Sequence, residues 1–370
     1  MKWAIRDLLN PVVTRSMIFG ANSFDIEYIL KKIDGIKVMS GKQIQNVWLG
    51  EWAEKIRKYT DLARQAADSG HRISARAYYK LAAQCHYACY MINTEDIDKK
   101  TEIYDGLAHA YSQYTGYCDH KVEYVEIPTK EGVLPAYLHF PDDGSQGPYP
   151  CVITYSGIGS CKEELEMLAE PLLERGVAVL TPGAGAAVIH NGIKCGGPML
   201  EAAFDGIYAF LANRADLDAD RIGNFGLCMG GGYAFRASAK YPETKCCVSL
   251  FPLLMHFADQ GSIPVWMKRG RWSSFQYADN YLEGMKQIEE GTVGCDFLMA
   301  YSDDDNWMDT EASLRLFDKA TGYKEKIYIS EKPAYVSEET IMHAMPVGEQ
   351  FHWVKHLAAD FLADRLTERK

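Results

Sequence analysis

The chain has 370 residues, of which 47% are hydrophobic and 24% are charged. This length and composition predict a globular protein of roughly two domains, at about 150 residues each. The formal net charge of −11 argues against nucleic acid or an anionic membrane surface as a partner, because an acidic surface repels phosphate groups.

Two further features concern the compartment in which the protein works. No stretch approaches about 18 uninterrupted apolar residues, so no membrane span is predicted. The ten cysteines lack C-x-x-C spacing, and we interpret them mainly as small apolar core residues rather than as disulfides or metal ligands. Residues 1–21 lack the continuous apolar core of a secretory signal, so a reducing cytoplasm is the expected location.

Residues 1–118 are predicted to form a helical N-terminal domain. Apolar side chains recur at steps of three and four over residues 43–70 and again over residues 74–92, as on one face of a helix. Trp48 and Trp52 lie on the first of these faces. They belong either to the core of the domain or to the wall of a substrate pocket, which would then accept an apolar or aromatic ligand.

From residue 119 to the C-terminus, predicted strands alternate with predicted helices. Such alternation is typical of an α/β fold with a mostly parallel sheet covered by helices on both faces. Residues 252–292 have a mixed pattern and are interpreted as a small insertion. The strands are expected at residues 122–127, 134–140, 151–155, 177–181, 221–225, 246–251, 295–301 and 326–329, and the helices at 163–175, 199–212, 233–241 and 349–366.

The most informative motif is Gly226-x-Cys228-x-Gly230, which follows a predicted strand and precedes a small-residue helix. This spacing predicts a nucleophile elbow, the tight strand–turn–helix that exposes a catalytic side chain, with a thiol in place of the usual serine. The N-terminus of the following helix is expected to favour the thiolate form of Cys228.

A nucleophilic thiol needs a base and an acid that orients the base. Asp305 follows a predicted strand within a run of three aspartates and is the preferred acid, with Asp304 as the alternative. His343 lies between the last predicted strand and the final helix and is the predicted base. This gives the chain order nucleophile, acid, histidine that the hydrolase fold requires.

The oxyanion of a tetrahedral intermediate needs backbone N–H donors. Met229, directly after the nucleophile, is predicted to supply one, and Ile158 the other, with Gly159 as the alternative. Gly157 and Gly159 are also expected to line the substrate pocket together with Trp48 and Trp52. The glycines of this loop lack the Gly-Lys-Ser/Thr ending of a phosphate loop, and no cofactor or metal is expected.

These motifs resemble two related groups of enzymes. The segment Gly226-Leu-Cys-Met-Gly-Gly is similar to the elbow of dienelactone hydrolases, which use a Cys-His-Asp triad. Over nearly the whole chain, the tryptophan helix, the second helix and the segment Gly157-Ile-Gly-Ser-Cys-Lys-Glu-Glu resemble α/β-hydrolases with an N-terminal helical domain. That group includes the 2,6-dihydroxypseudooxynicotine hydrolase-like enzymes, the FrsA-like esterases and the fungal polyketide-shortening hydrolases.

The resemblance implies an α/β-hydrolase fold, a homodimer and residues 1–118 acting as a cap. It implies hydrolysis of an ester, cleavage of a β-diketone-type carbon–carbon bond or action on a polyketide-like chain. From the thiol itself we expect the carbonyl of a small ester, thioester or β-diketone to form an acyl-enzyme on Cys228, which is released by hydrolysis, cyclisation or acyl transfer. Cys228 departs from the group, which mostly has serine, and residues 182–187 replace its Gly-Pro-Gly-Gln-Gly-Glu segment. The alternatives are a lyase or isomerase using Cys228 and His343 as acid and base, or an inactive binding protein.

Overall fold

The computed structural model describes residues 9, 12–35, 40–92, 97–130, 132–155, 157, 160–183, 197–252, 291–303, 305, 308–329 and 349–367. The chain divides into two compact units, Met1–Asp119 and His120–Lys370. The division lies one residue beyond the end predicted for the helical domain. We describe each unit by itself.

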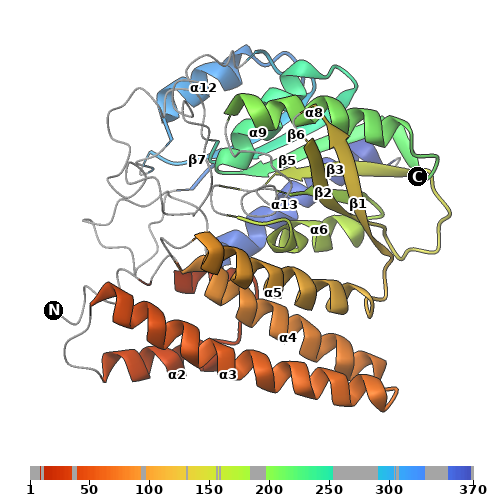
Figure 1. Ribbon diagram of the computed structural model, residues 1–370. Helices are drawn as coiled ribbons and strands as arrows, with labels where there is room; N and C mark the ends of the chain where they lie inside the picture. Colours follow the sequence, from red (N-terminus) through yellow and green to blue (C-terminus); the bar gives the residue numbers. More distant parts are fainter. Residues whose placement is uncertain are drawn as a thin grey trace. The chain divides into compact units, whose positions relative to one another are not determined.

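The first unit is built from helices that pack in chain order, α3 on α4 and α4 on α5 (Figure 1). Their bounds are α2 Ser23–Asp34, α3 Gly41–Asp68, α4 Arg72–Met91 and α5 Ile97–Thr115. Ser40 and Gln43 form a reciprocal capping box that starts α3. Trp48 and Trp52 are fully buried in the core of this unit, and the indole N–H of Trp48 donates to the carbonyl of Ala88 at 2.8 Å.

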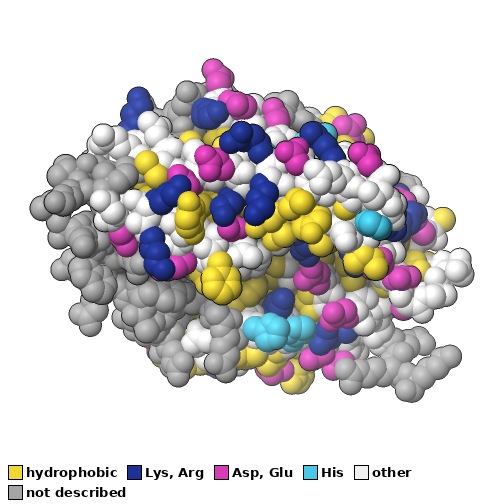
Figure 2. Space-filling view, turned by 90° about the horizontal axis from the view of Figure 1, so that it is seen from below, with side chains coloured by type: hydrophobic (Ala, Val, Ile, Leu, Met, Phe, Trp, Pro, Cys, Tyr) yellow, Lys and Arg dark blue, Asp and Glu magenta, His cyan; other side chains and the backbone are white. Residues whose placement is uncertain are grey.

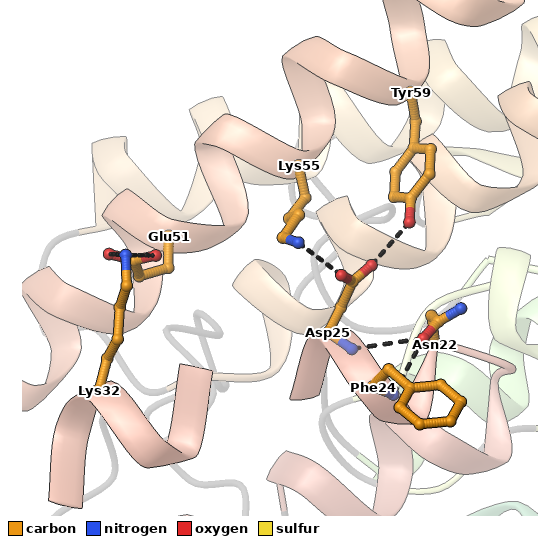
Figure 3. Close-up of polar contacts among 7 residues, drawn as sticks. All are labelled: Asn22, Phe24, Asp25, Lys32, Glu51, Lys55 and Tyr59. Atoms are coloured by element: carbon orange, nitrogen blue, oxygen red, sulfur yellow. Dashed lines mark hydrogen bonds and ion pairs between the residues drawn. The ribbon is translucent and has the colours of Figure 1, made fainter. Parts of the chain in front are cut away.

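That burial agrees with the core role for the two tryptophans, whereas a role in a substrate pocket stays a prediction. Polar contacts also join α2 to α3, as Figure 3 shows. Asp25 accepts hydrogen bonds from Lys55 Nζ at 2.5 Å and from the Tyr59 hydroxyl at 2.7 Å. Tyr59 thus adds a polar contact to the face predicted for α3, which continues to the buried residues Ala63 and Ala66.

The second unit is organised around one eight-stranded sheet with the order β1-β2-β4-β3-β5-β6-β7-β8. Pairing is antiparallel between β1 and β2 and between β2 and β4, and parallel between all other neighbours in that order. The mostly parallel sheet predicted from the sequence is confirmed. The strands are β1 Val122–Thr129, β2 Gly132–His139, β3 Tyr149–Tyr155, β4 Ala178–Pro182, β5 Leu217–Leu227, β6 Thr244–Leu250, β7 Asp296–Tyr301 and β8 Lys324–Tyr328.

Helices cover both faces of this sheet (Figure 1). On one face α13, Glu349–Leu366, packs against α6, Glu166–Leu173, which follows a short 3₁₀ helix, Glu163–Leu165. The other face carries α8, Gly197–Ala212, α9, Met229–Lys240, and α12, Thr310–Lys319. The ring of Phe297 on β7 contacts both Phe235 of α9 and Phe317 of α12, which places these two helices on the same face.

The central strands are buried because both of their faces are covered. Every residue of β4 is buried, as are the last six residues of β3 and of β5. This explains why their sequences read as continuous apolar runs rather than as alternating patterns. Most of the insertion predicted for residues 252–292 lies outside the described residues.

Two predicted starts are wrong by four residues. The strand expected at residues 221–225 begins at Leu217. The helix expected to begin at Tyr233 begins at Met229, four residues earlier. Three consecutive glycines weaken helix propensity and hide the start in the sequence. In the structure, close packing against neighbouring backbone overrides that propensity.

Two observations concern the membrane and nucleic-acid partners that the sequence argues against. Among the described residues, no helix is both long and apolar enough to cross a membrane. On the face shown in Figure 2, basic and acidic side chains intermingle over the described surface.

Candidate active site

Cys228 occupies the turn between β5 and α9. Its backbone angles are φ 62° and ψ −125°, a conformation that costs a non-glycine residue on the order of 1–3 kcal/mol. The backbone N–H of Cys228 donates to the carbonyl of Leu250 at 2.8 Å, and its carbonyl accepts the N–H of Gly232 at 3.2 Å. These bonds hold the strained residue between the end of β6 and the first turn of α9.

The glycines around Cys228 are required by close backbone contacts. A Cβ atom on Gly226 would lie 1.9 Å from the carbonyl oxygen of Gly230, and one on Gly231 would lie 2.9 Å from the carbonyl oxygen of Leu250. The Ser249 hydroxyl also donates to the carbonyl of Gly231 at 2.7 Å. The turn is therefore tight for the steric reason that the Gly-x-Cys-x-Gly motif predicts.

The loop that follows β3 lies against the cysteine. A Cβ atom on Gly157 would be 3.2 Å from Cys228 Cβ and 3.5 Å from its Sγ. Gly157 thus leaves room beside the sulfur, and its role in lining a substrate pocket stays a prediction. Met229 is the first residue of α9. The other two predicted loop residues, Ile158 and Gly159, lie outside the described residues.

Asp305 follows β7, the second strand along from β5. The ends of these strands are aligned, because Leu227 pairs with Leu250 and Leu250 pairs with Ala300. Asp305 is only 7% exposed, and its carboxylate accepts the N–H of Met308 at 2.9 Å.

The neighbouring aspartates differ from Asp305. Asp303 is exposed to solvent, and Asp304 lies outside the described residues. A buried carboxylate that the backbone orients is the better candidate for a triad acid, so the structure favours Asp305 over Asp303. The predicted base, His343, also lies outside the described residues.

The other described cysteines differ from a working nucleophile in their surroundings. All nine described cysteines, Cys228 included, are free thiols. Burial raises the pKa of Cys89, Cys151 and Cys295 to about 12 and that of Cys246 and Cys247 well above the ordinary range. These thiols therefore stay protonated and unreactive near neutral pH. Among the described residues, no group of three or more potential metal ligands is present.

A buried ion pair lies directly after the Gly157 loop. It was not predicted from the sequence, where its two residues served only to support the family resemblance. Lys162 and Glu163 are at most 3% exposed, with Nζ and Oε1 2.5 Å apart. The Lys162 ammonium also lies 5.1 Å from the ring centre of Tyr137 on β2 and 5.8 Å from that of Tyr124 on β1. Two adjacent opposite charges next to a buried helix were the only signal in the sequence.

Lys162→Met is expected to lower the free energy of unfolding by about 3–5 kcal/mol, because it removes the buried cation beside the Glu163 carboxylate. Urea denaturation of the full chain measures the loss. The matched control is Lys240→Met, which removes a half-exposed cation 2.9 Å from Asp205 and should cost less than about 1 kcal/mol. Equal losses of unfolding free energy in the two variants would show that the buried Lys162–Glu163 pair contributes no more to stability than the half-exposed pair.

The chain has the α/β-hydrolase fold. Its strand order, its elbow between β5 and α9 and its buried acid after β7 are those of the fold predicted from the sequence. The solved structure of 2,6-dihydroxy-pseudo-oxynicotine hydrolase superposes with a TM-score of 0.74 at 19% sequence identity, covering 96% of this chain and 95% of that one.

Sequence comparison gives relatives of the same kind, although no family model matches the chain. The chain is 33% identical over 226 residues to Hydrolase ORFZ of Pyricularia oryzae, covering 56% of this chain and 52% of that protein. It is 28% identical over 210 residues to 2,6-dihydropseudooxynicotine hydrolase of Paenarthrobacter nicotinovorans, covering 55% and 54%. The chain thus spans about half the length of the curated relatives it matches. The predicted resemblance to this group of α/β-hydrolases is confirmed.

Proposed function

We propose that the protein is a cysteine-dependent hydrolase or acyl-transfer enzyme that acts on the carbonyl group of a small molecule. The observation that carries the proposal is the strained backbone of Cys228, with φ 62°, at a turn that also packs against Gly157. Backbone strain of this kind is concentrated at functional sites, where the surrounding structure compensates for its cost. The names of the relatives, which are hydrolases, support the same class of reaction.

The proposed reaction begins when His343 accepts the thiol proton of Cys228 and the sulfur attacks the carbonyl carbon. Asp305 orients the imidazole and stabilises its charged form. The N–H groups of Met229 and Ile158 hold the oxyanion of the tetrahedral intermediate. When the intermediate collapses, the bond to the leaving group breaks, the imidazolium protonates that group, and a thioester remains on Cys228.

Release needs a second nucleophile. Water gives a proton to His343 and attacks the thioester. The carbon–sulfur bond then breaks, the imidazolium returns the proton to Cys228 Sγ, and a carboxylic acid is released. A hydroxyl or amine of the bound acyl chain gives a cyclised product by the same steps. An ester, a thioester or a β-diketone of a largely apolar, polyketide-like molecule is the substrate class that we propose. The homodimer, the cap role of the helical unit and a reducing cytoplasmic location belong to the same proposal.

The rival function is a lyase or isomerase in which Cys228 and His343 transfer protons only, or a binding protein without chemistry. Alkylation by iodoacetamide at slightly acidic pH, followed by peptide mapping, separates an activated thiol from an inert one. Cys228 is expected to be the most rapidly labelled cysteine, and His343→Ala should slow its labelling by about tenfold or more. Labelling of Cys228 no faster than that of the deeply buried thiols would favour the binding protein.

A further inference from the structure

A single buried amide connects the elements that meet at the elbow. Asn224 lies on β5, four residues before Cys228, and is fully buried. Its side-chain oxygen accepts the Tyr155 hydroxyl at 3.3 Å, and its nitrogen donates to the Tyr208 hydroxyl and to the Ser238 hydroxyl, both at 2.9 Å. A buried amide needs such partners, because an unpaired polar group in the core costs on the order of 1–3 kcal/mol.

The direction of these bonds follows from burial and from the hydroxyl groups themselves. Burial raises the pKa of Tyr155 well above its ordinary range, so this hydroxyl keeps its proton and donates it to the Asn224 oxygen. The Tyr208 hydroxyl accepts from Asn224 and also shares a hydrogen bond of 2.8 Å with the Thr244 hydroxyl. The four side chains around Asn224 thus form one continuous network.

The partners of Asn224 come from the elements on which an oxyanion hole depends. Ser238 is on α9, the helix that begins with Met229. Tyr155 is the last residue of β3, directly before the loop that contains Gly157. Asn224 itself is on the strand that leads into the elbow. One side chain therefore ties both arms of the elbow to the end of the strand that precedes the loop.

We infer that the Asn224–Tyr155 hydrogen bond positions the loop after β3, at Gly157, against the elbow, and so keeps the shape of the space beside Cys228 Sγ in which a carbonyl group reacts. The inference rests on the proposed function. Gly157 lies two residues after Tyr155, and Met229 begins the helix that follows Cys228, so the shape of the site depends on how these elements are held together. A displacement of about 1 Å can cost on the order of 100-fold in rate. Asn224 and Tyr155 are positioning residues, because neither is placed in contact with the reacting atoms.

Two conservative variants separate positioning from ordinary core stability. Tyr155→Phe removes the bond that reaches the β3 loop, whereas Tyr208→Phe removes a bond to the same Asn224 amide from α8. With p-nitrophenyl acetate as the acyl probe, Tyr155→Phe is expected to lower kcat by about tenfold with little change in KM, and Tyr208→Phe to stay within about twofold of the unmodified protein. The Tm of both variants should fall by a similar amount. In both, iodoacetamide should label Cys228 at the same rate as in the unmodified protein.

Amide hydrogen exchange tests the inference without any turnover. A peptide spanning residues 154–163 should exchange about tenfold faster in Tyr155→Phe and unchanged in Tyr208→Phe. Equal changes in the two variants, in either kcat or exchange, would overturn the positioning role and leave only a packing role. A chain that shows no burst of p-nitrophenolate but keeps the exchange difference would count against the proposed chemistry and not against the positioning of the loop.

Discussion

Cys228→Ala is expected to reduce the turnover of an activated ester by about 10⁴-fold or more, because no other group in the proposed site can form the acyl-enzyme. The folded structure should tolerate the change. Alanine is smaller than cysteine, and the bonds that hold the turn come from the backbone of residue 228 rather than from its side chain. Steady-state kinetics with p-nitrophenyl acetate, together with the Tm of the variant, measures both effects.

Cys228→Ser is the matched control for that prediction. A serine that retains substantial activity would indicate plain acyl transfer through the triad, whereas complete loss would indicate chemistry that needs a thiol. Undiminished turnover in Cys228→Ala would contradict a covalent role for this residue altogether. It would then favour the rival in which the fold binds its ligand and a different group carries the chemistry.

Gly226→Ala is expected to have the largest structural effect among Gly→Ala changes at the described glycines of the second unit. The new Cβ would lie 1.9 Å from the oxygen of Gly230, 2.3 Å from its carbonyl carbon and 2.7 Å from the nitrogen of Gly231. All three atoms are backbone, so relief requires the first turn of α9 to move. We expect a loss of at least about 3 kcal/mol in the free energy of unfolding, with loss of activity at temperatures where the variant remains folded.

Gly294→Ala provides the control, because a Cβ there meets only Thr321 Oγ1, at 3.9 Å. Its free energy of unfolding should differ from that of the unmodified chain by less than about 1 kcal/mol. Urea denaturation measures both variants. A stable, active Gly226→Ala protein would show that the turn is looser than these contacts require.

Features with a local cause could be predicted from the sequence. The elbow needs glycine at Gly226 because of backbone atoms only four and five residues away. A requirement of such short range appears in the sequence as the Gly-x-Cys-x-Gly motif. The strands of the parallel sheet were also predictable, because burial on both faces gives continuous apolar runs. The start of α9 was not predictable, because Gly231 is required by its contact with Leu250 at the end of β6, which helix propensity does not reflect.

Features assembled from distant elements left weaker signals. Asn224 reads as one polar residue in an apolar strand, and its partners lie on β3, α8 and α9. Lys162 is buried beside aromatic rings of β1 and β2, and at least one other strand separates these strands from Lys162 in the sequence. The acidic run after β7 predicted a carboxylate without deciding which one. Asp305 is buried whereas Asp303 is exposed, which separates these two, and the choice of Asp305 over Asp304 stays a prediction.

The most direct test of the central claim is intact-protein mass spectrometry after brief exposure of the full chain to p-nitrophenyl acetate. We predict that one acetyl group is added, that peptide mapping assigns it to Cys228, and that the adduct decays as product accumulates. An unmodified mass throughout steady turnover, or a stable acetyl group on any other residue, would contradict covalent catalysis at the elbow.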